Sequence, residues 1–324
     1  AVGNDTLAAL DAGAEGYNTV VGYGAGYVMT TGVQNTLVGG LAGDALTTGS
    51  YNTVFGKSAL SGEDAGSYNT AIGYYALAVQ DAGADAYNVA VGHNAGGAVS
   101  TAVRNTLIGG YAGDALTTGN YNVAVGHEAL SSEDGNGYNT AVGYRALATQ
   151  NAGANAYNVA LGYDAAQAIS TGVRNTIIGT AAGDALTTGS YNVALGMYAL
   201  STEDTHGGNT AIGYSALATQ DAGADAYNVA IGYEAGNDIS TGIRNVLVGA
   251  LAGDALTTGG YNTALGWNAL STATTHGYSV AIGARALANQ DTGANSYNVA
   301  VGYDAGGAVT TGVGNTLVGG LAGD

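Results

Sequence analysis

Residues 17–26 read YNTVVGYGAG, and the same pattern returns as YNVAVGHNAG at residues 87–96. The spacing of 70 residues then recurs three more times, with copies around Asn158, Asn228 and Asn298. Inside one 70-residue superrepeat, shorter units of 17, 17, 17 and 19 residues begin at Asn18, Asn35, Asn52 and Asn69. Because self-similarity at a fixed period marks a repeat architecture, this pattern decides the fold class.

The short units align column by column when each Asn is numbered position 0. Eighteen units align, position +4 is always Gly and position +7 is always Ala. Position 0 is Asn in every unit except at Ser279. We expect these three columns to form structural ladders; in the first superrepeat they are Asn18, Asn35, Asn52 and Asn69, then Gly22, Gly39, Gly56 and Gly73, then Ala25, Ala42, Ala59 and Ala76.

Positions +1 to +3 predict a short β-strand in every unit. Position +1 is Thr or Val and position +3 is a large apolar residue, and such residues are typical of strands. Alternation places +1 and +3 on one face, which we expect to point inward, and Asn, +2 and Gly on the other. The second unit of each superrepeat differs, with Leu37 or an equivalent large residue at +2, and we expect it to face something different.

A unit of this length with one strand and a Gly-containing return predicts one coil of a parallel β-solenoid or β-roll. Coils stacked at about 4.8 Å bury apolar faces that a single coil leaves open. Eighteen coils predict a rod on the order of 90 Å long. A helix is disfavoured, because Gly in a helix interior costs about 1 kcal/mol relative to Ala. We therefore expect an all-β fold with coils of 17 to 19 residues in four-coil superrepeats.

The repeat occupies residues 1–324 as a single continuous region. Residues 1–3 (AVG) align with residues 71–73 (AIG), and residues 321–324 (LAGD) align with residues 41–44, so the chain begins and ends within a coil. Solenoids normally carry capping elements at their ends. We therefore expect a segment of a longer fibre.

Composition and charge exclude several classes of protein. The chain has 57 Gly, no Cys and no Pro, and 24 acidic against 6 basic residues give a net charge of −18. The absence of Cys excludes disulfides and Cys-based zinc sites. Nucleic-acid binding requires clustered Lys and Arg, which this chain lacks. No apolar stretch is long enough to span a membrane.

The consensus Y-N-T/V-A-I/V/L-G-Y-x-A-L resembles the repeats of bacterial and viral tail-fibre-domain proteins. Residues 278–283 (YSVAIG) are also similar to the SVAIG core of the head repeats in trimeric autotransporter adhesins. The resemblance implies a homotrimer of parallel β-rolls. The coils here are longer than the usual adhesin repeat and follow a strict four-coil period.

Repeated Asp residues in the turns raise the alternative of calcium binding. Asp64 and Asp81 occupy position +12 of successive coils with Asp85 nearby, and the set recurs as Asp204, Asp221 and Asp225. The other two superrepeats keep only part of this set, and the nonapeptide of calcium-binding rolls is absent. We expect solvated polar turns and no metal or cofactor, with calcium at these six residues as the alternative.

No set of residues indicates catalysis. His93, His127, His206 and His276 occupy columns where other residues stand in other copies, and His206 and His276 share one turn position. A catalytic histidine requires a particular environment, so we interpret these four as interchangeable surface residues. We expect that the chain is not an enzyme.

Tyrosines form the most suggestive surface. Tyr17, Tyr51, Tyr68 and Tyr87 precede the Asn column, and Tyr74 follows the Gly at +4. Stacked coils would align such side chains into ladders, which either seal a seam between chains or bind glycans and proteins.

These observations predict a structural and adhesive fibre, extracellular, on a cell surface or as a virion appendage. Its partners are copies of itself, as a homotrimer or an end-to-end filament, and a cell-surface glycan or protein, without nucleic acid or membrane insertion. Many weak contacts would act together through multivalency. Two alternatives stay open, a solenoid that binds ice or another lattice and the non-catalytic shaft of a glycan-processing fibre.

Overall fold

The computed structural model describes residues 1–11 and 15–324, and each coil contributes one three-residue strand at positions +1 to +3. The chain divides into two compact units, Ala1–Leu161 and Gly162–Asp324. The first unit contains β1 (Thr19–Val21), β2 (Thr36–Val38), β3 (Thr53–Phe55), β4 (Thr70–Ile72), β5 (Val89–Val91), β6 (Thr106–Ile108), β7 (Val123–Val125), β8 (Thr140–Val142) and β9 (Val159–Leu161). The second contains β10 (Thr176–Ile178), β11 (Val193–Leu195), β12 (Thr210–Ile212), β13 (Val229–Ile231), β14 (Val246–Val248), β15 (Thr263–Leu265), β16 (Val280–Ile282), β17 (Val299–Val301) and β18 (Thr316–Val318).

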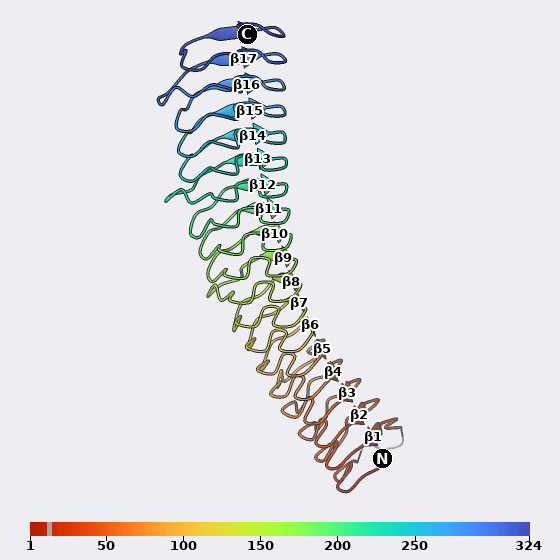
Figure 1. Cartoon of the computed structure of the whole chain (residues 1–324). Coiled ribbons are helices and arrows are strands. Elements are labelled where there is room, and N and C mark those ends of the chain that lie inside the picture. Colours follow the sequence, from red (N-terminus) through yellow and green to blue (C-terminus); the bar gives the residue numbers. More distant parts are fainter. Residues whose placement is uncertain (12–14) are drawn as a thin grey trace. The chain divides into compact units, whose positions relative to one another are not determined.

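Within each unit, every strand pairs in parallel with the next strand, position for position. Thr19 lies opposite Thr36 and Val21 opposite Val38, and the same register continues to β9. The second unit repeats this register from β10 to β18. Figure 1 shows the strands of each unit stacked in chain order. Residues 1–11 and 15–324 contain no helix, and the predicted all-β parallel solenoid is confirmed.

The direction of the strand side chains differs from the expectation. Position +2 is buried in every strand from β1 to β17, whereas +1 and +3 are half-buried or exposed. The expectation that +1 points inward is therefore wrong. The physical reason is that the interior is already filled, because it holds Ala at +2 and +7 in most coils together with one large apolar side chain at +8 or +11 in many of them.

A ladder of buried Asn side chains occupies position 0. In the coil of Asn105, the side-chain amide donates to the carbonyl of Gly119 at 2.9 Å, which closes the coil on itself. Its Oδ1 accepts from the backbone N–H of Asn122 in the next coil at 2.8 Å. The same two contacts hold Asn35 to Gly49 at 2.9 Å and to Asn52 at 2.8 Å. Each Asn thus satisfies polar backbone groups that would otherwise be buried without partners.

The fourth coil of a superrepeat departs from this ladder. Its two additional residues displace the carbonyl that closes the other coils, and the Nδ2 atoms of Asn69, Asn139 and Asn209 have no hydrogen-bond partner among the described residues. In the last superrepeat this position is Ser279, whose hydroxyl contacts that of Ser296. Ser279, the one residue in the Asn column that is not Asn, therefore belongs to a fourth coil, the coil type in which the Asn Nδ2 lacks a partner.

The four-coil period reflects the filling of the interior. In the third and fourth coils a buried Leu at +8 fills the coil, as Leu60 and Leu77 do. In the first and second coils +8 is Gly or Ala, and the bulk lies instead at +11, as in Met29 and Leu46. Because interiors are close-packed, the two arrangements are not interchangeable coil by coil.

Leu37 explains the unusual second coil. It is fully buried at +2 and points toward the space that Gly43 leaves at +8. A Cβ atom on Gly43 would meet Leu37 Cδ2 at 3.2 Å. The second coil therefore faces the same interior as the others, and its large +2 residue compensates for a small +8 residue.

Glycine at +4 is required by the approach of the next coil. Gly109 has a φ of +137°, and a Cβ atom there would collide with the carbonyl oxygen of Gly126. The backbone is also left-handed at −1, +6 and +8, where non-glycine residues such as Tyr51 (φ 61°) and Leu60 (φ 51°) occur. The residue pattern does not indicate these conformations, which are uncommon for such side chains.

We expect Asn122→Ser to destabilise the chain by about 2–4 kcal/mol, because it leaves the carbonyl of Asn136 and the N–H of Asn139 buried without partners. The matched control is Asn139→Ser with Ala156→Ser, which copies Ser279 and Ser296; it removes only the acceptor of the Asn158 N–H, so we expect it to cost about 1–2 kcal/mol less than Asn122→Ser. Urea denaturation of the full chain measures both. Equal losses would contradict the role given to the Asn ladder.

Candidate functional site

The outward face of the strands is apolar and carries no charged residue. It consists of position +1, always Thr or Val, and position +3, always Val, Ile, Leu or Phe. Phe55 is 57% exposed and Leu161 44% exposed, although each has neighbouring strands beside it. This face extends along β1 to β9 in the first unit and along β10 to β18 in the second. We refer to these +1 and +3 side chains as the outward face.

A column of exposed tyrosines lies at position −1, immediately before the Asn ladder. The ring centroids of Tyr51 and Tyr68 are 4.9 Å apart with an interplanar angle of 1°, and those of Tyr68 and Tyr87 are also 4.9 Å apart. The second unit has the same stack between Tyr261 and Tyr278 at 5.0 Å. The predicted ladder of Tyr51, Tyr68 and Tyr87 is therefore present, and Tyr17 is exposed in the same column.

In the second, third and fourth superrepeats, arginine fills the second coil's place in this column. The guanidinium carbon of Arg104 lies 5.8 Å from the ring centroid of Tyr87 and 5.5 Å from that of Tyr121. Its Nη1 donates to the Tyr121 hydroxyl at 2.9 Å. Arg244 makes the equivalent contacts in the second unit, including a 2.6 Å hydrogen bond to Tyr261. Cation–π contacts of this kind extend the stack where a ring is missing.

Tyr74 belongs to a second aromatic column at +5. Its ring stacks on that of His93 with centroids 5.4 Å apart, and Lys57 Nζ lies 5.9 Å from its centroid. Farther along, the rings of His127 and Tyr144 stack at 5.8 Å. His93 and His127 thus act as aromatic surface residues, which agrees with the interpretation of them as replaceable.

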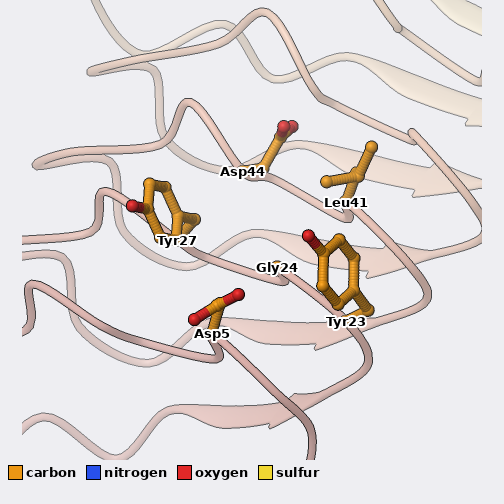
Figure 2. A pocket seen from close by; sticks show the side chains of 6 residues that line it. All are labelled: Asp5, Tyr23, Gly24, Tyr27, Leu41 and Asp44. Atoms are coloured by element: carbon orange, nitrogen blue, oxygen red, sulfur yellow. The ribbon is translucent and has the colours of Figure 1, made fainter.

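A pocket in the first unit combines two tyrosines with two acids. Its lining residues are Asp5, Tyr23, Gly24, Tyr27, Leu41 and Asp44, and Figure 2 shows the two rings on either side of Gly24. Burial raises the pKa of the Asp44 carboxyl, while hydrogen bonds from backbone amides act in the opposite direction. Later superrepeats replace Tyr27 by Gly97, Gln167, Asn237 or Gly307, so the pocket is not a repeated feature of the solenoid.

The structure brings together some of the acidic residues considered for calcium. Ligand atoms of Glu63, Asp64 and Asp81 lie within 4.8 Å of one another, and those of Glu203, Asp204, His206 and Asp221 form a second such group. Asp85 and Asp225 lie outside both groups. Asp225 instead accepts from the Gly207 N–H at 3.0 Å and the Tyr227 hydroxyl at 3.3 Å. Calcium at the six acids stays an untested alternative.

A column of buried glutamates at +11 was missed by reasoning from the sequence. Glu63, Glu133 and Glu203 are fully buried in a column that is apolar in the first and second coils. Glu63 is satisfied by the side-chain amide of Gln80 at 2.8 Å and the Gly66 N–H at 2.6 Å. The available signal was Glu followed one coil later by Gln in an otherwise apolar column.

Burial governs the ionisation of this column. Desolvation raises the pKa of Glu133 to about 7, against the lowering effect of hydrogen bonds from Asn136. Desolvation also raises the pKa of Glu203. His276 is fully buried, and burial lowers its pKa despite Asp291 Oδ1 at 3.8 Å from its Nδ1. The interpretation of His206 and His276 as interchangeable surface residues is therefore wrong, because one faces Glu203 and the other is enclosed.

No protein-family model matches this sequence, and a search of curated proteins found no match. Over residues 1–11 and 15–324, no helix is long and apolar enough to cross a membrane.

We expect Glu133→Gln to raise the thermal midpoint by a few degrees at pH 8 and to leave it unchanged near pH 4. A carboxyl whose folded pKa is about 7 and whose ordinary value is 4.5 stabilises the fold fully below 4.5, and this contribution is lost as pH rises through 7. Circular dichroism melts across this range provide the measurement. The exposed Glu128→Gln is the control, and an equal pH-dependent gain there would contradict the assignment.

Proposed function

We propose that the chain is part of a structural and adhesive fibre, located outside the cell, on a cell surface or on a virion, in which three copies pack through the outward face. The observation that carries this proposal is an apolar sheet face without a single charged residue on a chain of net charge −18. Contiguous apolar surface of this kind marks interaction sites in soluble proteins.

The size of the outward face supports an interface between chains. Nine strands at about 4.8 Å spacing make a face roughly 40 Å long in each unit, and two side chains make it about 7 Å wide. Each unit thus exposes on the order of 300 Å², comparable to the largest apolar patch on a typical monomer. The outward face of one unit alone would thus supply over a third of the about 800 Å² that each partner buries in a standard interface.

A second copy of the same chain is the occupant that the charge distribution favours. Identical chains of charge −18 repel each other wherever their acids face one another. The outward face is free of that repulsion, because all 24 acidic residues lie in other columns. We propose three copies rather than two because of the resemblance to trimeric adhesin heads. In such a fibre the tyrosine columns stay exposed and are available for multivalent contact with glycans or proteins.

We expect Val91→Lys with Ile231→Lys to convert a trimer of three times 31.5 kDa into folded monomers, because each Lys would be buried without a partner between chains. Mass photometry and circular dichroism report the mass and the fold. The control is Met197→Lys, since position +5 accommodates Lys57 naturally and Met197 is 41% exposed. A monomeric parent chain would overturn the trimer, and a larger mass would indicate end-to-end filaments.

Lattice binding is a second candidate, favoured by the outward direction of position +1. Thr19, Thr36, Thr53 and Thr70 form four consecutive outward rungs in the first unit. The adjacent +3 row is aliphatic and Val interrupts the Thr row elsewhere, so only one short row of hydroxyls is available. We therefore expect zero thermal hysteresis at millimolar protein concentration, and measurable hysteresis would favour an ice-binding role.

A further inference from the structure

We propose that Glu203, Asp204, His206 and Asp221 form a binding site for one divalent transition-metal ion such as Zn²⁺. Their ligand atoms lie within 4.8 Å of one another. Glu203, Asp204 and His206 come from the turn after β11, and Asp221 comes from the equivalent turn after β12. The site therefore joins two consecutive coils of the second unit.

The second observation is an unpartnered oxygen on a buried carboxylate. Glu203 is fully buried, and its Oε1 accepts from the His206 N–H at 3.0 Å and lies 3.1 Å from His206 Nδ1. Its Oε2 is buried and has no hydrogen-bond partner in the described part of the chain. A buried carboxylate oxygen without a donor is costly, and a bound cation would satisfy it.

Glu63, the equivalent glutamate of the first superrepeat, has a hydrogen-bond donor that Glu203 lacks. Glu63 Oε2 receives a hydrogen bond from Gln80 Nε2 at 2.8 Å. The corresponding Gln220 is buried, and its Nε2 makes no hydrogen bond to any described residue. The amide that donates to Glu63 therefore makes no such hydrogen bond to Glu203. Glu133 Oε2 of the second superrepeat is also without a partner among the described residues, but its turn has Asn136 and Asn151 where the third superrepeat has His206 and Asp221.

The donor set selects the class of ion. Zinc binds imidazole nitrogen and carboxylate oxygen at about 2.0–2.2 Å, so neighbouring ligand atoms stand about 3–4 Å apart around a bound ion, and the four ligand atoms here lie within 4.8 Å of one another. Calcium and magnesium prefer oxygen ligands alone, whereas an imidazole favours zinc and its neighbours in the first transition row. One nitrogen and three carboxylates from two adjacent coils would hold the ion and cross-link those coils.

The repeat supplies three related turns that lack the full set. The first superrepeat has Gly66 in place of the histidine. The second has Glu133 and Asp134 but Asn136 and Asn151 at the other two positions. The fourth keeps His276 and loses both acids of its own turn to Ala273 and Thr274. We therefore expect one ion per chain.

Isothermal titration of Zn²⁺ into the full chain, after dialysis against EDTA, tests the proposal. The expected stoichiometry is one ion per chain, and Co²⁺ as a spectroscopic probe should show d–d absorption with a nitrogen ligand. His206→Asn with Asp221→Asn copies the turn at Asn136 and Asn151, so the variant has a natural precedent for folding. We expect it to weaken binding at least about 100-fold, because loss of outer-shell groups alone costs 10- to 100-fold.

The converse variant provides the matched gain of function. Asn136→His with Asn151→Asp completes the same set around Glu133 and Asp134, and we expect it to raise the stoichiometry from one to two. Absence of Zn²⁺ binding to the parent chain would overturn the proposal. Binding that His206→Asn with Asp221→Asn leaves unchanged would do the same, since it would assign the zinc to dispersed surface acids. Equal affinity for Ca²⁺ would also overturn it, in favour of an oxygen-only site.

Discussion

The fold depends on one interaction, the hydrogen bonds of a buried Asn amide to two backbone groups. Its Nδ2 closes a coil by binding the carbonyl fourteen residues later, and its Oδ1 binds the N–H of the next coil, as in Asn105. A coil of 17 residues has only one three-residue strand, so most of its backbone polar groups depend on contacts outside the strand ladder. A side chain of the right length, repeated in register, satisfies the groups that this narrow interior would otherwise bury unpaired. The small residues at +2, +4 and +7 follow, because they allow the two sides of the coil to approach the amide.

The same narrow interior determines which surface is available for binding. The interior already holds the large side chains of +8 or +11, as in Leu60 and Met29, and the aliphatic residues at +3 lie on the outward face. A sheet that would normally cover its apolar side with its own chain thus presents it to solvent. The proposed trimer would cover that side, and the acids and tyrosines would then lie on the remaining surface. The proposed assembly and the geometry of the coil would then both result from the limited volume of the interior.

Repeat length, strand position, parallel stacking and the Asn, Gly and Ala columns could be predicted from the sequence, because each produces a column visible by alignment alone. The direction of the strand could not be predicted. Alternation along a strand shows which residues share a face, but it does not show which face is buried. Here the face with Val21 and Val38 is apolar and the opposite face carries Asn, so hydrophobicity favoured the face that is in fact exposed. The left-handed backbone at Tyr51 was hidden for a similar reason, since Tyr carries no signal for that conformation. Asp204 and Asp221 were found by their spacing, whereas Glu203 and His206 were not, because they belong to one group only when two coils are stacked.

The exchange of interior bulk between +8 and +11 has a consequence for how such a chain changes length. Duplicating one 17-residue coil would place three coils of one interior arrangement in succession, for example a third Leu60-like side chain where a coil with a Met29-like side chain would otherwise follow. Duplicating four coils restores every interior neighbour, including the two residues added in the fourth coil. Unequal recombination between superrepeats would therefore yield chains that fold, whereas recombination between single coils would create overpacked or hollow junctions. On this view the gene can lengthen or shorten the solenoid only in steps of 70 residues, about 19 Å of stacked coils.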